Sequence, residues 1–179
     1  MTPLHGALAI SKRFLEPVSV AVDATCGNGH DTFSLAQLAD RVYAFDIQEP
    51  AIAATREKVA DFEHVCVIRD SFVSFRDYVS EPIDLIVFNL GYLPGSDKQV
   101  TTSVSDLSSG LQAMLAQLSP SGRVVIVAYP GHPAGQAESQ WLKETLSRLD
   151  PSSFRSFHLY HMNGPNDPAE LYLIERNAR

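Results

Sequence analysis

The stretch DATCGNGHDT, residues 23–32, lies between a short apolar segment and an amphipathic one. The apolar segment, VSVAVDA at residues 18–24, is rich in β-branched side chains, which is typical of a strand buried on both faces. Gly27 and Gly29 allow a tight turn and let a ligand approach bare backbone at the start of the next helix. The stretch therefore predicts a strand, a glycine turn and a helix that together cradle a ligand.

Four more short apolar runs follow, separated by segments in which apolar residues repeat at helical spacing. These strand candidates are residues 41–47, 64–68, 83–89 and 122–129. The clearest helical pattern starts behind a cap at Thr102 or Ser103 and is stopped by Pro120 and Gly122. Strands that alternate with helices predict an α/β fold, in which helices cover both faces of a mostly parallel sheet.

The last two strand candidates, residues 154–161 and 169–175, have no convincing helix between them. We therefore expect them to pair antiparallel at the edge of the sheet. At the start of the chain, Leu4, Leu8 and Leu15 mark one face of a leading helix. Because the 179 residues contain no linker or low-complexity tract, we expect a single domain over residues 1–179.

The composition, 45% hydrophobic and 20% charged, is that of an ordinary soluble globular protein. A formal net charge of −7 argues against a surface covered with phosphate contacts, but it allows RNA to bind at a local patch, for which Lys12, Arg13 and Lys98 are candidates. Cys26 and Cys66 form no metal-spaced pair and no disulfide framework, which favours the cytoplasm. Neither a metal site nor a membrane span is expected, because the sequence lacks a cysteine cluster, an HExxH motif and a long apolar run.

Polar side chains stand at the ends of the predicted strands, namely Asp23, Asp46, Asp70 and Asn89. Ligands of open α/β sheets bind beyond the carboxyl ends of the strands, so we expect these side chains to meet. An acid after the second strand is placed to accept hydrogen bonds from both hydroxyl groups of a ribose, and Asp70 with Ser71 would then lie near the adenine. For Asp70 alone, the alternative is a cap on a helix that starts at Ser71.

Small departures from known fingerprints distinguish between nucleotides. A dinucleotide site needs a third glycine where this chain has Thr32, and we expect no second domain to carry a hydride acceptor. Asp23 would repel a pyrophosphate but would suit the ammonium of an amino-acid group, which favours S-adenosylmethionine over NAD. The predicted cofactor-binding residues are Asp23, Thr25, Gly27, Asn28, Gly29, His30, Asp31, Thr32, Asp46, Ile47, Gln48, Asp70, Ser71 and Asn89.

The segment NLGYLPGSDK, residues 89–98, follows the fourth strand and begins with a polar Asn89 that needs hydrogen-bond partners. It resembles the Asn-Pro-Pro-Tyr element of methyltransferases that alkylate amino nitrogens, with Leu90 and Gly91 in place of the prolines and Tyr92 retained. The catalytic candidates are Asn89 to orient an amine, Tyr92 to stack on a base and His132 to accept a proton. The alternative for His132 is a cap on the next helix or a place in a loop.

Four segments carry a wider resemblance, namely DATCGNGHDT, FNLGYLPGSDK, YPGHPAGQAE and NGPNDPAELYLIE. In order and spacing they are similar to the small bacterial class I methyltransferases that have been labelled rRNA methylases. Members of that family methylate the amino group of 5-aminomethyl-2-thiouridine at the wobble position of tRNA. The resemblance implies a Rossmann-like, seven-stranded fold, S-adenosylmethionine as methyl donor, the tRNA anticodon loop as substrate and a homodimer.

The sequence differs from the family pattern at Cys26 and Ser96, where Met and Gly are expected, and both changes leave the turn glycines intact. Three other functions stay open from the sequence. Two are methyltransferases that act on a small-molecule amine or on rRNA. The third is a Rossmann module that binds a nucleotide without catalysis.

Overall fold

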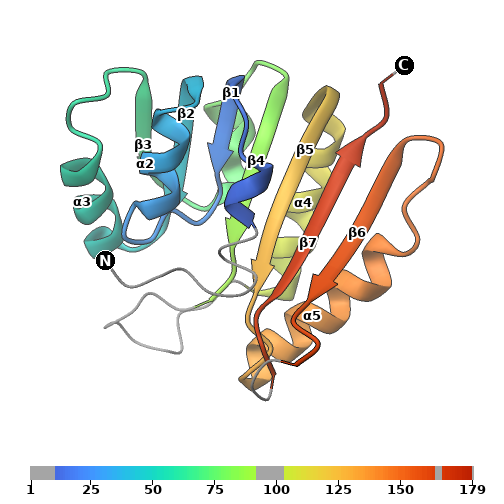
Figure 1. The fold of residues 1–179 in the computed structure, drawn as a ribbon. Helices are drawn as coiled ribbons and strands as arrows, with labels where there is room; N and C mark the ends of the chain where they lie inside the picture. Colours follow the sequence, from blue (N-terminus) through green and yellow to red (C-terminus); the bar gives the residue numbers. More distant parts are fainter. Residues whose placement is uncertain (1–10, 92–102, 164–166, 179) are drawn as a thin grey trace.

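The computed structural model describes residues 11–91, 103–163 and 167–178. Its centre is one sheet of seven strands in the order β3-β2-β1-β4-β5-β7-β6 (Figure 1). The strands are β1 Val18–Asp23, β2 Ala39–Asp46, β3 Val65–Arg69, β4 Ile83–Asn89, β5 Leu118–Ala128, β6 Phe154–Tyr160 and β7 Glu170–Arg176. β1 to β5 are parallel, which confirms the predicted α/β sheet.

Helices cover both faces of this sheet (Figure 1). The first face carries the 3-10 helix η1 Lys12–Phe14, α2 His30–Ala36 and α3 Glu49–Lys58, and the second carries the 3-10 helix η2 Phe72–Asp77, α4 Val104–Gln117 and α5 Pro133–Leu146. The larger core lies on the second face, where Phe45, Phe75 and Phe88 are fully buried. The predicted cap of α4 is confirmed, because the Ser103 hydroxyl accepts a hydrogen bond from the Asp106 amide at 3.0 Å.

The last two strands pair antiparallel, as expected. β7 is antiparallel to both β5 and β6 and lies between them, so β6 forms the edge of the sheet. β5 begins at Leu118, directly after α4, rather than at the predicted Gly122. The sequence hides this extension because Ser119, Pro120 and Ser121 have turn-like chemistry, and Ser121 has a left-handed φ of 67°.

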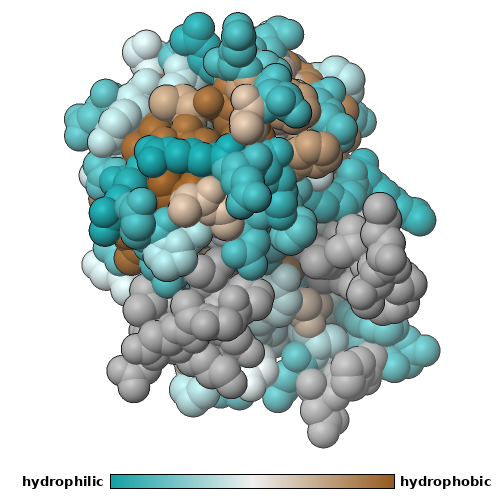
Figure 2. Space-filling view, turned by 90° about the vertical axis from the view of Figure 1, so that its left-hand side faces the viewer, coloured by the Kyte–Doolittle hydropathy of each residue, from teal (hydrophilic) through white to brown (hydrophobic). Residues whose placement is uncertain are grey.

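Strand β3 forms the opposite edge, and Figure 2 shows the molecule from that side, with hydrophobic and hydrophilic side chains mixed on the surface. Within β3 only Ile68 is buried. The ladder pairs Asp46 of β2 with Arg69 of β3, so the residues that follow them, Ile47 and Asp70, lie next to each other at the carboxyl edge of the sheet. Among the described helices, none has the length and apolar character needed to cross a membrane.

Candidate active site

The glycine turn after β1 has the conformation that the sequence predicts. Gly27 and Gly29 have φ values of 50° and 73°, in the left-handed region that side chains other than glycine rarely adopt. Helix α3 supports the turn from behind, because the Thr55 hydroxyl donates to the Gly27 carbonyl at 3.0 Å. A Cβ on Gly29 would lie 2.9 Å from the Thr55 Cα. The turn therefore depends on glycine both for its backbone angles and for its contact with α3.

Asp23, at the end of β1, lies inside the protein beneath this turn. Its carboxylate accepts hydrogen bonds from the Thr32 hydroxyl at 2.7 Å and from the Thr25 amide at 3.2 Å. Burial, followed by the nearby charge of Asp31, raises the pKa of Asp23 to about 7. Because it is fully buried, Asp23 orients the loop rather than presenting the open carboxylate that we expected for the cofactor's ammonium group.

Asp46, at the end of β2, connects that strand to the glycine turn. Its carboxylate accepts from the Gly27 amide at 3.1 Å and from the Gln48 amide at 2.9 Å. The side chain remains half-buried, and the neighbouring Ile47 is 56% exposed despite being apolar. A carboxylate beside an exposed apolar side chain is suited to hold a ribose and the face of an adenine.

Asp70 and Ser71 follow β3. The Ser71 hydroxyl caps η2 by accepting from the Val73 amide at 3.2 Å. The Asp70 carboxylate accepts from the Ser71 amide at 2.7 Å and from the Tyr78 hydroxyl at 3.0 Å, and this second hydrogen bond raises the pKa of Tyr78. The cap therefore belongs to Ser71, while Asp70 stays partly exposed beside Ile47.

Asn89, at the end of β4, is held at both its backbone and its side chain. Its amide donates to the Thr25 hydroxyl at 2.8 Å, and that hydroxyl donates back to the Asn89 carbonyl at 3.3 Å. The side-chain nitrogen donates to Asp31 at 3.2 Å, and the side-chain oxygen accepts from the Tyr129 hydroxyl at 2.9 Å. These contacts fix which way the Asn89 amide points.

Tyr129 lies at the end of the fifth strand but was not among the predicted site residues. It follows β5 directly, and burial together with the charge of Asp31 raises the pKa of its hydroxyl. The hydroxyl therefore stays protonated and donates to Asn89 at neutral pH. The available signal in the sequence was a polar aromatic residue at the carboxyl end of a buried strand, which is where the other site residues also stand.

Lys12 and Asp31 complete this network on the first face of the sheet. The Lys12 ammonium forms an ion pair with the Asp31 carboxylate, whose side chain is 12% exposed, and it lies 3.4 Å from the Ser34 hydroxyl. Because the Lys12 ammonium is paired with Asp31, Lys12 is a poor candidate for an RNA contact. Lys98, the other lysine candidate, lies outside the described residues.

The histidine candidates have structural partners. The His132 Nδ1 accepts from the Gly135 amide at 3.1 Å and caps α5, as the alternative interpretation expected. The neutral imidazole then carries its hydrogen on Nε2, so His132 could take a proton only by giving up this cap. Lys58 of α3 donates to the Asn28 carbonyl at 2.6 Å and lies 3.2 Å from the His30 Nδ1. Tyr92 lies outside the described residues.

Metal ligands do not gather in the part of the chain that the structure describes. No group of three or more His, Cys, Asp or Glu side chains there could hold a metal ion. Cys26 is buried and Cys66 is exposed, and both are free thiols.

Comparisons with known proteins agree with this geometry. A family model described as "Putative rRNA methylase" matches residues 42–175. The chain belongs to this family. The crystal structure of a protein from Clostridium thermocellum, described as a "putative rRNA-methylase", has a TM-score of 0.90 and 33% identity, covering 97% of this chain and 99% of that one. A protein from Streptococcus mutans, described as "a putative methyltransferase" and solved with S-adenosylhomocysteine, has a TM-score of 0.89 and 35% identity, covering 97% of this chain and 99% of that one.

A relative from Arabidopsis thaliana is named tRNA (mnm(5)s(2)U34)-methyltransferase, chloroplastic. It is 30% identical over 186 residues, which cover 95% of this chain and 68% of that protein. Family, fold and relatives together establish this chain as a class I methyltransferase that depends on S-adenosylmethionine. The glycine turn, the half-buried Asp46 and the exposed Ile47 fit that cofactor.

Proposed function

We propose that this enzyme transfers a methyl group to the amino nitrogen of 5-aminomethyl-2-thiouridine at the wobble position of tRNA. The relative from Arabidopsis thaliana, whose name specifies a tRNA wobble methyltransferase, supports this substrate. The observation that carries the proposal is the fixed amide of Asn89 at the end of β4. An oriented amide oxygen is the group that a primary amine needs in order to be aimed at a methyl donor.

The Asn89 side-chain oxygen has two lone pairs, and Tyr129 uses one of them at 2.9 Å. Asp31 holds the amide nitrogen at 3.2 Å, which prevents the amide from exchanging its two ends. The second lone pair of the oxygen is left to accept an N–H from the substrate. This contact would turn the amine lone pair toward the donor methyl, and such orientation is the main task in an in-line displacement.

The substrate amine must lose a proton before it can react. A primary alkylamine, by analogy with lysine at about 10.4, is mostly protonated at neutral pH. S-adenosylmethionine, when bound, supplies a methyl group on a positively charged sulfur. Asn89 would orient the amine by accepting from it. His132 remains our candidate to take the proton, and to do so its Nδ1 would have to release the Gly135 amide. Tyr92 is proposed to stack on the base.

The cofactor-binding residues are assigned by what they present at the carboxyl edge. Asp46 would accept from the ribose hydroxyl groups, Ile47 would contact the adenine and Asp70 would accept from its exocyclic amine. The turn from Gly27 to His30, with Thr25 and Asp31 beside it, would face the amino-acid end. Asp23 and Thr32 would act from beneath, by holding the turn.

The remaining expectations are also proposals. We propose the anticodon loop as the bound part of tRNA, a single domain over residues 1–179, a homodimer and a location in the cytoplasm. Each of these follows from the family resemblance or the composition rather than from a contact in the described structure.

A methylation assay tests the proposal. The protein is incubated with S-adenosylmethionine and tRNA that carries 5-aminomethyl-2-thiouridine, and nucleosides are then analysed by mass spectrometry. We expect one added methyl on that nucleoside and none on matched tRNA with an unmodified wobble uridine. Methylation of rRNA or of a simple alkylamine, with the modified tRNA left unchanged, would overturn the proposed substrate.

A further inference from the structure

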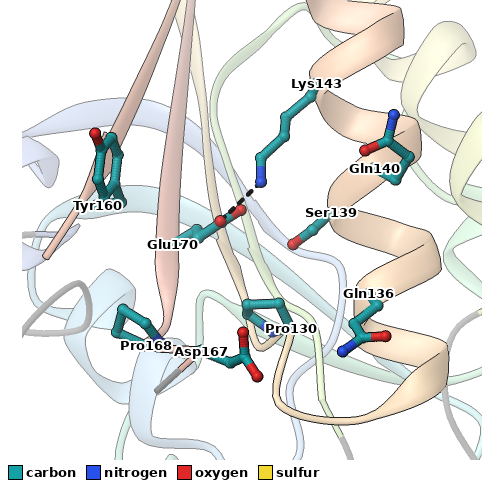
Figure 3. Close-up of a pocket in the computed structure, with 9 residues that line it drawn as sticks. All are labelled: Pro130, Gln136, Ser139, Gln140, Lys143, Tyr160, Asp167, Pro168 and Glu170. Carbon is teal, nitrogen blue, oxygen red and sulfur yellow. Dashed lines mark hydrogen bonds and ion pairs between the residues drawn. The ribbon is translucent and has the colours of Figure 1, made fainter. Parts of the chain in front are cut away.

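A hollow lies between α5 and the strands β6 and β7. The cavity there has a volume of about 320 Å³, and Figure 3 shows the side chains that line it. Its lining includes Gln136, Ser139 and Lys143 of α5, Tyr160 of β6, Glu170 of β7 and Asp167 before β7. None of these side chains takes part in the network around Asn89.

This cavity adjoins the candidate active site along the chain. Pro130, which lines it, directly follows Tyr129, the residue whose hydroxyl donates to Asn89. The ends of β5 and β6 and the start of the antiparallel β7 all lie at the carboxyl edge of the sheet. A substrate held at Asn89 would therefore reach the cavity by passing the end of β5.

The charges in the cavity do not suit a phosphate. The Lys143 ammonium lies 2.8 Å from the Glu170 carboxylate, and the two charges balance (Figure 3). Asp167 adds a carboxylate to the lining, so the charged groups named here sum to one negative charge. A phosphate would be repelled, whereas a neutral ligand with N–H donors would be accepted.

The remaining groups suit a flat, polar ring. Tyr160 is 58% exposed, and its ring lies 5.5 Å from that of His158, which stacks on Tyr172 at 4.6 Å. These rings form an aromatic column whose outer member borders the cavity. Ser139 is only 2% exposed, and its hydroxyl has no hydrogen-bond partner among the described residues. A buried hydroxyl without a partner is costly unless a ligand supplies one.

We propose that this cavity binds one unpaired RNA base that flanks the methylated nucleotide, and this inference rests on the proposed tRNA substrate. Unpaired bases are recognised by stacking on aromatic side chains and by hydrogen bonds to their edges. Tyr160 supplies the ring, and Asp167, Gln136 and Ser139 supply polar atoms for the edge. A base with an exocyclic amine fits best, because a carboxylate can accept from it.

The first test compares two variants on opposite faces of one strand. Tyr160→Ala should raise the KM for an anticodon stem-loop about tenfold, as expected for the loss of one stacked base. Phe157→Ala is the matched control, because Phe157 is 46% exposed and its odd separation from Tyr160 puts it on the other face of β6. Its KM should stay at the wild-type value, and both variants should bind S-adenosylhomocysteine and unfold thermally like the wild type.

The second test identifies the base by removing it. Stem-loops that each carry one abasic nucleotide beside the target are assayed with the wild type and with Tyr160→Ala. One abasic position should raise the wild-type KM about tenfold and have no effect on Tyr160→Ala, because the stacking partner is already gone. Equal abasic penalties in both proteins, or equal effects of Tyr160→Ala and Phe157→Ala, would overturn the inference.

The two proposals fail in different ways. If the wild-type protein does not methylate the stem-loop, the proposed function fails. Equilibrium binding of the same RNA in the presence of S-adenosylhomocysteine then still tests the cavity. Weaker binding by Tyr160→Ala than by Phe157→Ala supports the base site, and equal binding rejects it.

Discussion

The two sides of the carboxyl edge differ in how their polar groups are satisfied. At the ends of β1, β2 and β4, Asp23, Asp46 and Asn89 each make two or more hydrogen bonds within the protein. On α5, the buried Ser139 hydroxyl and both oxygens of Glu138 have no hydrogen-bond partner among the described residues. The first side is organised in advance, as a site that must align a methyl transfer should be. The second side retains buried polar groups without partners in the described part of the chain, and one of them, Ser139, lines the cavity.

The largest effect should come from substituting Asn89, which lies at the centre of the hydrogen-bonded side. Asn89→Ala removes the amide oxygen that we propose orients the amine, and we expect kcat to fall by about 10²- to 10³-fold. The Kd for S-adenosylhomocysteine should change little, because the ribose and adenine contacts are assigned elsewhere. Single-turnover kinetics and calorimetry check the two halves of this prediction. A variant with normal turnover would show that Asn89 does not place the amine.

The next largest effect concerns Glu138 of α5 and the pH dependence of stability. This carboxyl group is 1% exposed, and burial raises its pKa to about 7 from a reference of 4.5. The folded protein therefore binds its proton more tightly than the unfolded chain does. The stability from this group is complete below about pH 4.5 and is lost as the pH rises to about 7, which amounts to about 3 kcal/mol.

Glu138→Gln should remove this loss, so its free energy of unfolding should fall less than that of the wild type between pH 5 and pH 8. Asp23, whose pKa is also about 7, leaves part of the pH dependence in place. Urea titrations at the two pH values measure the difference. Glu144→Gln, at an exposed position of the same helix, is the control and should behave like the wild type. If the free energy of unfolding of Glu138→Gln falls as much between pH 5 and pH 8 as that of the control, the Glu138 carboxyl group must have a partner or contact with solvent.

A smaller effect should come from Asp46→Ala, which removes the proposed ribose contacts and the hydrogen bond to the Gly27 amide. We expect the Kd for S-adenosylhomocysteine to rise about 30-fold, equivalent to about 2 kcal/mol. Asp70→Ala, which removes a carboxylate from the adenine end only, should raise it less. Calorimetry with both variants gives the ratio of their Kd values for S-adenosylhomocysteine. An equal effect of the two substitutions would argue against the assigned orientation of the nucleoside.

Local signals in the sequence were enough for the fold and for the conformation of the glycine turn. The apolar run before Asn89 predicts β4 with its observed bounds, and the paired glycines predict the turn after β1. The cap at Ser103 follows from its place before a helical pattern. Each of these features depends on residues close together in the chain, where propensity and spacing are informative.

Features that depend on distant residues could not be predicted. The position of β7 between β5 and β6 is set by tertiary packing, and the pairing of Lys12 with Asp31 depends on how the start of the chain meets α2. The Asp23 carboxylate could point outward to a ligand or inward to Thr32, and spacing alone does not choose between these directions. The same holds for the hydroxyl of Tyr129, which reaches Asn89 from a neighbouring strand.

A crystal structure of this protein with S-adenosylhomocysteine tests the central claim most directly. We predict that the ribose lies at Asp46, that the adenine lies beside Ile47 and that the sulfur faces the side-chain oxygen of Asn89. Density for the ligand at another place on the protein, or an Asn89 side chain turned away from the sulfur, would contradict the account.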